Sequence, residues 1–290
     1  MVKRFWSAAL AAALLAAPAA TFAQEVAEPI AAEDNIGVTI GIDFTNEYIS
    51  QGLIFENDGF IAQPYLEIGV TFTDWLSLTA GAWGSLHSEH TDAGAINAPG
   101  SASNFDMIYE IDYYIGPTFT YDKFSLSALY LVYTSPNDGF ETSYNLDFSL
   151  SYDDTGLIQE DFALLPYVRL FFETDGKAGS GTDEGIYLEL GVGPSFELVK
   201  SEDFPITLTI PAAIYLGFDD FYADDEAFGG VSIGAVLSTP LTSIIPTAYG
   251  EWSASLGLTY YYLNDEVQFG AFAGDNENRF KVTAGLSASF

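Results

Sequence analysis

Apolar residues recur at every second position in twelve segments of the chain, with small, polar or acidic residues between them. The segment at 144–152 is YNLDFSLSY, in which aromatic or aliphatic residues alternate with Asn, Asp and Ser. A period of two predicts β-strands with one apolar and one polar face. The predicted strands are 38–45, 66–72, 76–83, 109–119, 124–130, 144–152, 164–173, 186–197, 206–216, 231–237, 251–260 and 280–290.

The links between these segments alternate in character. Those after odd-numbered strands are mostly long and acidic, at 51–59, 87–104, 135–140, 174–184, 218–227 and 263–278. Those after even-numbered strands are short at 73–74 and 122–123, and longer at 153–161, 199–203 and 239–248. An even strand number with long links at one end is typical of bacterial outer-membrane barrels. The sequence therefore predicts an all-β fold, a transmembrane antiparallel up-and-down β-barrel of about 12 strands over 36–290, with both termini in the periplasm.

A secreted β-sandwich is the competing fold, because its strands alternate as well. Edge strands of a sandwich need polar or charged protection, whereas all twelve segments carry a largely apolar face. The opposite face is rich in Gly, Ser, Thr and acidic residues, which suits a hydrated lumen. Prolines within the predicted strands fit neither fold well. They are Pro64, Pro117, Pro166, Pro194 and Pro211.

The N-terminus has the pattern of an export signal. Lys3 and Arg4 precede an apolar run at 5–20, and the small-residue site Thr-Phe-Ala follows at 21–23. This arrangement predicts a cleavable signal peptide at 1–23 and a short periplasmic leader at 24–35. Pro18 near the end of the run disfavours a membrane helix. Export of such a barrel predicts the outer membrane of a Gram-negative cell as its location.

The charge balance excludes two classes of function. The chain has 41 Asp and Glu against 8 Lys and Arg, a formal net charge of −33. Sequence-independent binding of nucleic acid needs a basic surface, and so does binding to anionic membranes through a polybasic patch. Aromatic residues make up 16% of the chain, which distinguishes it from acidic disordered proteins. The chain has no cysteine, so no disulfide framework is expected.

The alternation predicts which charged side chains line the lumen, and most of them are acidic. They are Asp43, Glu67, Glu110, Asp112, Asp147, Arg169, Glu189 and Glu251. We expect Arg169 to pair with Glu189, whereas Glu110 and Asp112 have no obvious basic partner and should create the strongest field. Excess acid in an open lumen favours cations. Twelve strands lie between the filled eight-stranded barrels and the open sixteen-stranded ones, so an open and a plugged lumen are both compatible with the sequence.

Candidate chemistry is sparse, and neither catalysis nor a cofactor is predicted. The only histidines, His87 and His90, lie in LHSEH, which departs from the His-x-Ser-Asn-Gly motif of the twelve-stranded outer-membrane phospholipase. With Glu89 and Asp92 they could hold a metal, but they begin an acidic loop, and a polar loop rim is expected. The acidic run at 219–226 lacks the spacing of a calcium loop. A solvated loop is expected there, in which divalent ions could bridge to lipopolysaccharide phosphates.

The first hairpin, FTNEYISQG at 44–52 followed by FIAQP at 60–64, resembles the opening of the family of uncharacterised outer-membrane porins. Gln51 stands where many relatives carry Arg. The terminal SASF, ending at Phe290, resembles the signal recognised by the barrel assembly machinery. The resemblance implies a porin for passive diffusion of small polar solutes, and the lumen charges add a preference for cations. The alternative is a structural or surface-interaction barrel with a plugged lumen and acidic loops that bind divalent cations. The sequence indicates no oligomeric state.

Overall fold

The computed structural model describes residues 35–89, 107–137, 139–157, 162–201, 204–269, 272–273 and 277–290. The predicted signal peptide at 1–23 lies outside these residues, as do His90, Asp92 and all but the last residue of the predicted leader at 24–35. Among the described residues, no helix has the length and apolar character needed to cross a membrane.

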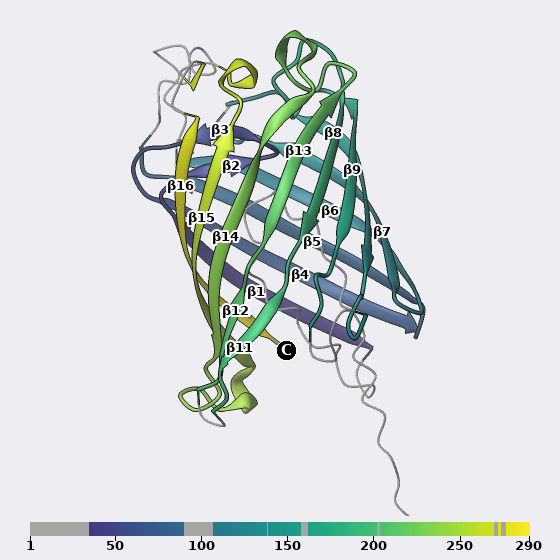
Figure 1. Ribbon diagram of the computed structural model, residues 1–290, viewed down its shortest axis with the longest axis vertical. Coiled ribbons are helices and arrows are strands. Elements are labelled where there is room, and N and C mark those ends of the chain that lie inside the picture. Colours follow the sequence, from purple (N-terminus) through teal and green to yellow (C-terminus); the bar gives the residue numbers. More distant parts are fainter. Residues whose placement is uncertain are drawn as a thin grey trace, which may run out of the picture.

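Twelve antiparallel strands close into one ring, as predicted (Figure 1). Each strand pairs with its neighbours in the chain, and β1 pairs with β16 to complete the ring. The ring strands are β1 (Ile36–Thr45), β4 (Ile61–Thr73), β5 (Leu76–His87), β6 (Ile108–Tyr121), β7 (Phe124–Thr134), β8 (Ser143–Tyr152), β9 (Tyr167–Asp175), β10 (Ile186–Val192) continued by β11 (Ser195–Val199), β12 (Ile206–Thr209) continued by β13 (Ala212–Phe218), β14 (Phe228–Pro240), β15 (Glu251–Leu263) and β16 (Asn278–Ser289). Among the described residues, three short 3-10 helices lie in the connections: η1 (Ala223–Asp225), η2 (Thr247–Tyr249) and η3 (Asp265–Val267).

Proline explains why two ring strands are interrupted. Pro194 separates β10 from β11, and Pro211 separates β12 from β13 at the facing position. Proline has no backbone N–H to donate to the ladder, so strand pairing stops there. The proline carbonyls still accept hydrogen bonds from the neighbouring strands and keep the sheet continuous. Ile210 N donates to Pro194 O at 2.9 Å, and Gly234 N donates to Pro211 O at 2.8 Å.

The two faces of the ring have opposite polarity. On β8, Leu146, Phe148 and Leu150 are exposed on the outside, whereas the alternate residues Asn145, Asp147 and Ser149 are buried inside. Large apolar side chains are exposed in this way on β1 and β4, on each strand from β6 to β11, and on β13 to β16. An apolar outer belt around a polar inner wall is typical of a barrel surrounded by lipid.

The two ends of the barrel also differ. The start of β1 and the end of β16 lie at one end, together with the tight turns between β4 and β5 and between β6 and β7 (Figure 1). The connections that follow β1, β5, β7, β9, β13 and β15 lie at the opposite end, which we call the loop end.

Arginine substitutions on adjacent residues of β15 test the face assignment. Leu256 is 55% exposed on the outer face near the middle of the strand. We expect Leu256→Arg to lower the free energy of unfolding in lipid vesicles by roughly 2–4 kcal/mol, because it places a charge in the hydrocarbon. Ser255→Arg should cost less, because that side chain faces inward towards Asp43. Urea titration with detection of the heat-modifiable folded form measures both, and a larger loss for Ser255→Arg would contradict the assignment.

Candidate functional site

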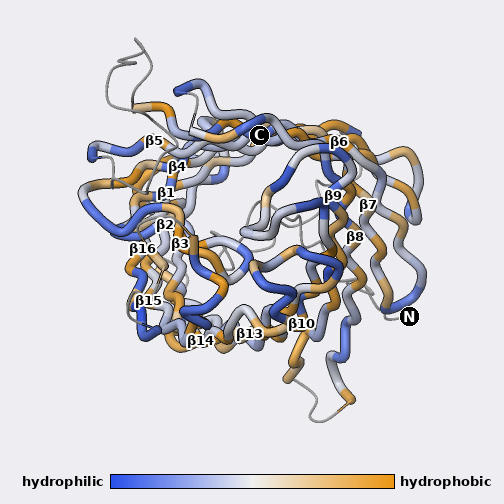
Figure 2. Tube along the Cα trace, turned by 90° about the horizontal axis from the view of Figure 1, so that it is seen from above, coloured by the Kyte–Doolittle hydropathy of each residue, from blue (hydrophilic) through white to orange (hydrophobic). Residues whose placement is uncertain are grey.

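A short hairpin between β1 and β4 forms a separate two-stranded sheet inside the outline of the ring (Figure 2). It consists of β2 (Tyr48–Ser50) and β3 (Leu53–Glu56). Gln51 and Gly52 make the turn with φ of 50° and 79°, and two successive positive φ angles are typical of tight hairpin turns. The predicted first strand at 38–45 does end at Thr45, but the predicted link at 51–59 is not a plain loop, since it contains the turn and β3.

The hairpin fills the lumen at the loop end with apolar side chains. Ile49, Leu53 and Ile54 are each 1% exposed or less. They belong to one buried cluster with residues of the inner wall and of the loop-end connections. Its aromatic members are Tyr114, Tyr133, Phe171, Tyr187, Tyr215, Phe221, Tyr222, Tyr261 and Phe272. This part of the lumen is therefore a packed core, which the strand alternation does not predict.

Directional polar contacts hold the hairpin in place. The side chain of Gln268 accepts from Ile54 N at 2.9 Å and donates to Gly52 O at 2.8 Å. Tyr222 OH donates to Gln51 O at 2.6 Å. These bonds satisfy backbone groups that would otherwise be buried without a partner, so the hairpin has a defined position against the loops.

The structure places most of the predicted lumen residues inside the barrel. Asp43, Glu110, Asp112, Asp147, Arg169 and Glu189 are all buried. Glu67 is partly buried, and Glu251 is exposed at the start of β15, next to the end of β16. Of the inward carboxylates, Glu251 is thus at the edge of the wall and apart from the others.

Tyrosine hydroxyls bind several of these carboxylates, which the strand alternation alone does not predict. Tyr114 OH donates to Glu67 at 3.2 Å. Glu189 accepts from both Tyr167 OH at 2.5 Å and Tyr187 OH at 2.6 Å. The alternation does place these tyrosines on the inner face, so the sequence indicates that they line the lumen. It does not indicate which carboxylates they bind, because the partners depend on the strand register.

Glycine on the neighbouring strand lets two of these rings lie flat along the wall. A Cβ at Gly81 would lie 2.3 Å from the ring of Tyr114, and a Cβ at Gly191 would lie 2.3 Å from the ring of Tyr167. Each glycine pairs directly with its tyrosine across the ladder. A tyrosine that covers a glycine in this way can extend its hydroxyl sideways to a carboxylate of the wall.

Arg169 is the centre of a buried charge cluster. Its guanidinium is 2.7 and 2.8 Å from the Asp147 carboxylate and 3.7 Å from that of Glu189. It also lies over the rings of Phe171 and Tyr187. The predicted pair with Glu189 is present, but the closer partner is Asp147, on the strand at the other side of β9.

Glu110 and Asp112 lie on the inner face of β6, two residues apart. Glu110 accepts from Tyr48 OH of the hairpin at 2.7 Å. Asp112 is fully buried, and its carboxyl group interacts directly with that of Glu110. Among the described residues, no Lys or Arg forms an ion pair with either residue.

His87 was expected to lie on a polar loop rim. This prediction is wrong, because the side chain is buried, with 1% exposure. Strand β5 continues to His87, so the alternation places it on the inner face. Its Nε2 is 2.8 Å from Ser85 Oγ, its ring stacks on Tyr109, and its Nδ1 is 3.8 Å from Glu56 of the hairpin. Within the described ranges, no group of three or more His, Cys, Asp or Glu residues could hold a metal ion.

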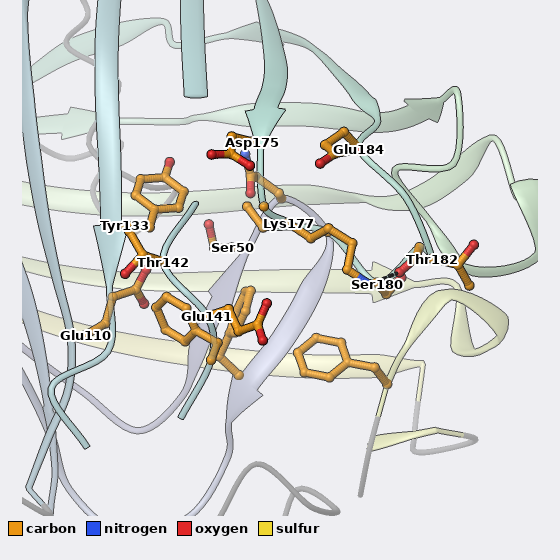
Figure 3. Close-up of a pocket in the computed structure, with 18 of the residues that line it drawn as sticks. Ser50, Glu110, Tyr133, Glu141, Thr142, Asp175, Lys177, Ser180, Thr182 and Glu184 are labelled. Carbon is orange, nitrogen blue, oxygen red and sulfur yellow. Dashed lines mark hydrogen bonds between the residues drawn. The ribbon is translucent and has the colours of Figure 1, made fainter. Parts of the chain in front are cut away.

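A cavity of about 670 Å³ opens at the loop end beside the hairpin (Figure 3). We call it the mouth cavity. Its rim carries the exposed carboxylates of Glu141, Asp175 and Glu184, and its floor includes the buried Glu110 and Tyr133. It connects the loop-end surface with the wall residues at the depth of the hairpin.

The connection between β9 and β10, which forms one wall of the mouth cavity, is held by two carboxylates. Glu173 accepts from the backbone N–H groups of Ala178, Gly179 and Gly185. Asp220 accepts from Thr182 N and Oγ1 at 2.7 and 2.8 Å, and from the next backbone N–H at 2.6 Å. The Thr182 hydroxyl and these N–H groups hold the pKa of Asp220 below its usual value, because they stabilise the charged form. The acidic run at 219–226 thus includes a residue that fixes a neighbouring loop.

No known protein family and no curated protein matches the chain. Solved structures of similar shape include the NanC porin, 12% identical, with 87% of this chain and 98% of that chain covered and a TM-score of 0.47. An outer membrane channel from Pseudomonas putida F1 is 14% identical, with coverage of 88% and 96% and a TM-score of 0.47. The KdgM porin is 8% identical, with coverage of 88% and 99% and a TM-score of 0.43. These similarities concern the barrel fold alone.

Proposed function

We propose that the protein is a narrow porin-like channel of the outer membrane that passes small polar solutes by diffusion and prefers cations. The observation that carries this proposal is the pair of buried carboxyl groups of Glu110 and Asp112 on the inner wall, which no Lys or Arg neutralises in the described part of the chain. Two adjacent buried acidic groups without a basic partner are costly, and a wall with a purely structural role would be expected to avoid them. A carboxylate facing a path for water and cations has a clear physical role.

The balance of inward charges supports the preference for cations. Arg169 is occupied by Asp147, and the other buried base on the wall is Lys281. The inward acids outnumber these bases: they are Asp43, Glu67, Glu110, Asp112, Asp147 and Glu189. In a narrow path with low-dielectric walls each charge acts more strongly than in bulk water.

The hairpin locates the proposed constriction. Because it fills much of the lumen at the loop end, a solute that enters through the mouth cavity would pass between the hairpin and β6. Glu110 lies there, bonded to Tyr48 of the hairpin, with Asp112 two residues further along the strand. We therefore assign the selectivity of the proposed channel to these two carboxylates.

A reversal potential under a KCl gradient in a planar bilayer tests this proposal. We expect the wild type to prefer K⁺ over Cl⁻, and the double variant Glu110→Gln with Asp112→Asn to lose much of that preference. The amide oxygen of Gln at position 110 can still accept a hydrogen bond from the Tyr48 hydroxyl, so the wall should keep its structure. The matched control is Asp225→Asn with Glu266→Gln, which removes two exposed carboxylates away from the mouth cavity. An anion-selective wild type, or equal shifts in both double variants, would contradict the assignment.

A plugged structural barrel is the second candidate function, and the apolar packing of the hairpin favours it. In this case Ile49, Leu53 and Ile54 close the lumen permanently. The acidic loops would then carry the function, by binding divalent cations that bridge to lipopolysaccharide phosphates. A wild-type protein that inserts correctly and conducts no ions would favour this candidate over the channel.

A further inference from the structure

We propose that the mouth cavity is a binding site for a polyamine, an aliphatic chain that carries two or more ammonium groups. The inference deepens the proposed channel function, because it names a class of solute held at the entrance. It rests on that function only as far as transport is concerned, since binding to the cavity does not require conduction.

The composition of the cavity wall suits such a ligand. The carboxylates of Glu110, Glu141, Asp175 and Glu184 are distributed around it. Aromatic rings lie between them, and ammonium groups bind favourably both to carboxylates and to the faces of aromatic rings. The rings are Tyr48, Phe55, Tyr109, Tyr133, Phe140 and Phe269. A chain of methylene groups with ammonium groups at intervals would match this alternation of acidic and apolar surface.

Two buried polar groups in the cavity wall have no hydrogen-bond partner among the residues that the structure describes. The Tyr133 hydroxyl and Gln51 Nε2 form no hydrogen bond within the described part of the chain, although the residues are only 4% and 2% exposed. Both residues line the cavity. Buried polar groups are nearly always hydrogen-bonded, so these two indicate a ligand that supplies the missing bonds. The hydroxyl oxygen can accept from an ammonium group, and the Gln51 amide can turn to present its oxygen.

The arrangement does not suit a bare metal ion. The carboxylates lie on three separate segments around the cavity, and no group among the described residues could hold a metal. The cationic side chain of the rim, Lys177, donates to Gly181 O at 2.9 Å, and no ion pair joins it to a carboxylate in the described ranges. The rim therefore keeps a net negative charge.

The cavity also has the size and order expected of a binding site. Its volume of about 670 Å³ falls within the range that holds small organic ligands. The bonds to Glu173 and Asp220 fix the connection between β9 and β10 without a ligand. Such preorganisation lowers the entropic cost of binding.

Isothermal titration of spermidine into the purified full-length barrel in detergent, at low ionic strength, tests the site. We expect saturable binding to the wild type at one site. Glu141→Gln with Asp175→Asn should weaken it about fivefold, the value for two exposed ion pairs. The control Asp225→Asn with Glu266→Gln removes the same charge elsewhere and should leave the affinity unchanged. Absence of saturable binding to the wild type, or equal weakening in both double variants, would overturn the inference.

Tyr133→Phe separates binding from folding. The substitution removes only a buried hydroxyl that has no partner in the described part of the chain, so the stability of the barrel should stay equal or rise. Spermidine affinity should nevertheless fall about tenfold or more, the cost of one hydrogen bond to a charged group. Unchanged affinity would overturn the role of Tyr133, and full displacement of spermidine by equimolar MgCl₂ would indicate only diffuse counterion attraction. A protein that binds spermidine without conducting ions refutes the channel alone, and one that conducts without binding refutes this site alone.

Discussion

Replacement of residues 48–56 by a short Gly-Ser link should raise single-channel conductance severalfold and make it steadier. These residues are the β2–β3 hairpin, whose apolar side chains fill the lumen at the loop end. Ring pairing does not involve them, because the hairpin forms its own sheet and β1 pairs directly with β4. The twelve-stranded wall should therefore close without them, and a hydrated path should replace the core.

A milder variant tests the same constriction without a deletion. Gln268→Ala removes the partner of Ile54 N and of Gly52 O, both of them buried. The unpaired groups would cost the docked hairpin about 1–3 kcal/mol each, so undocked states should become more frequent. Bilayer recordings should show more frequent and longer openings than in the wild type.

The control for both variants is Glu266→Ala, an exposed change on η3 in the same connection. It should leave conductance unchanged. A hairpin deletion that inserts as a heat-modifiable barrel but conducts like the wild type would contradict the position of the constriction. If it conducts while the wild type does not, the plugged barrel becomes the better description of the natural protein.

The ring could be predicted from the sequence because every strand faces lipid on one side and the inner wall on the other. Because successive residues of a strand face these two environments in turn, apolar and polar residues alternate in the sequence. The segment 144–152 shows this alternation without interruption. The sequence pattern is irregular at the positions where strand pairing is interrupted. Pro194 and Pro211 were inconsistent with continuous strands, and the structure places both in interruptions at facing positions.

The hairpin could not be predicted because its contacts are set by three-dimensional proximity. Tyr48–Ser50 and Leu53–Glu56 are too short to show a period, and they are apolar on both faces because they pack inside the ring. The turn at Gln51 and Gly52 was the usable signal. His87 was missed for a related reason: its strand extends beyond the last residues with clear alternation.

Partners across the lumen wall also depend on register, which a single sequence does not define. Arg169 was expected to pair with Glu189, and this contact exists at 3.7 Å. The register of β8 against β9 brings Asp147 closer still. Two tyrosine hydroxyls already stabilise Glu189, so the guanidinium is the main partner of Asp147.

Arg169→Met should therefore be among the most damaging single substitutions in the barrel. It leaves the Asp147 carboxylate buried without its cation, and breaking a buried ion pair on one side costs about 3–5 kcal/mol. The methionine keeps much of the volume and the contact with Phe171, so packing loss is not the main cause. Urea unfolding in lipid vesicles should show the loss as a lower midpoint with an unchanged slope.

A second substitution distinguishes the loss of the ion pair from a loss of packing. Arg169→Met with Asp147→Leu removes both charges, and such replacements of a buried pair by apolar residues are often neutral or stabilising. The double variant should thus recover most of the free energy of unfolding lost in Arg169→Met, since Glu189 keeps the hydroxyls of Tyr167 and Tyr187. The free energy of unfolding of Arg169→Lys should lie between those of the wild type and Arg169→Met, because lysine keeps the charge but not the two-point contact with Asp147. If the double variant is as unstable as Arg169→Met, then the arginine acts through its contacts with the rings of Phe171 and Tyr187, and the uncompensated charge of Asp147 is not the cause.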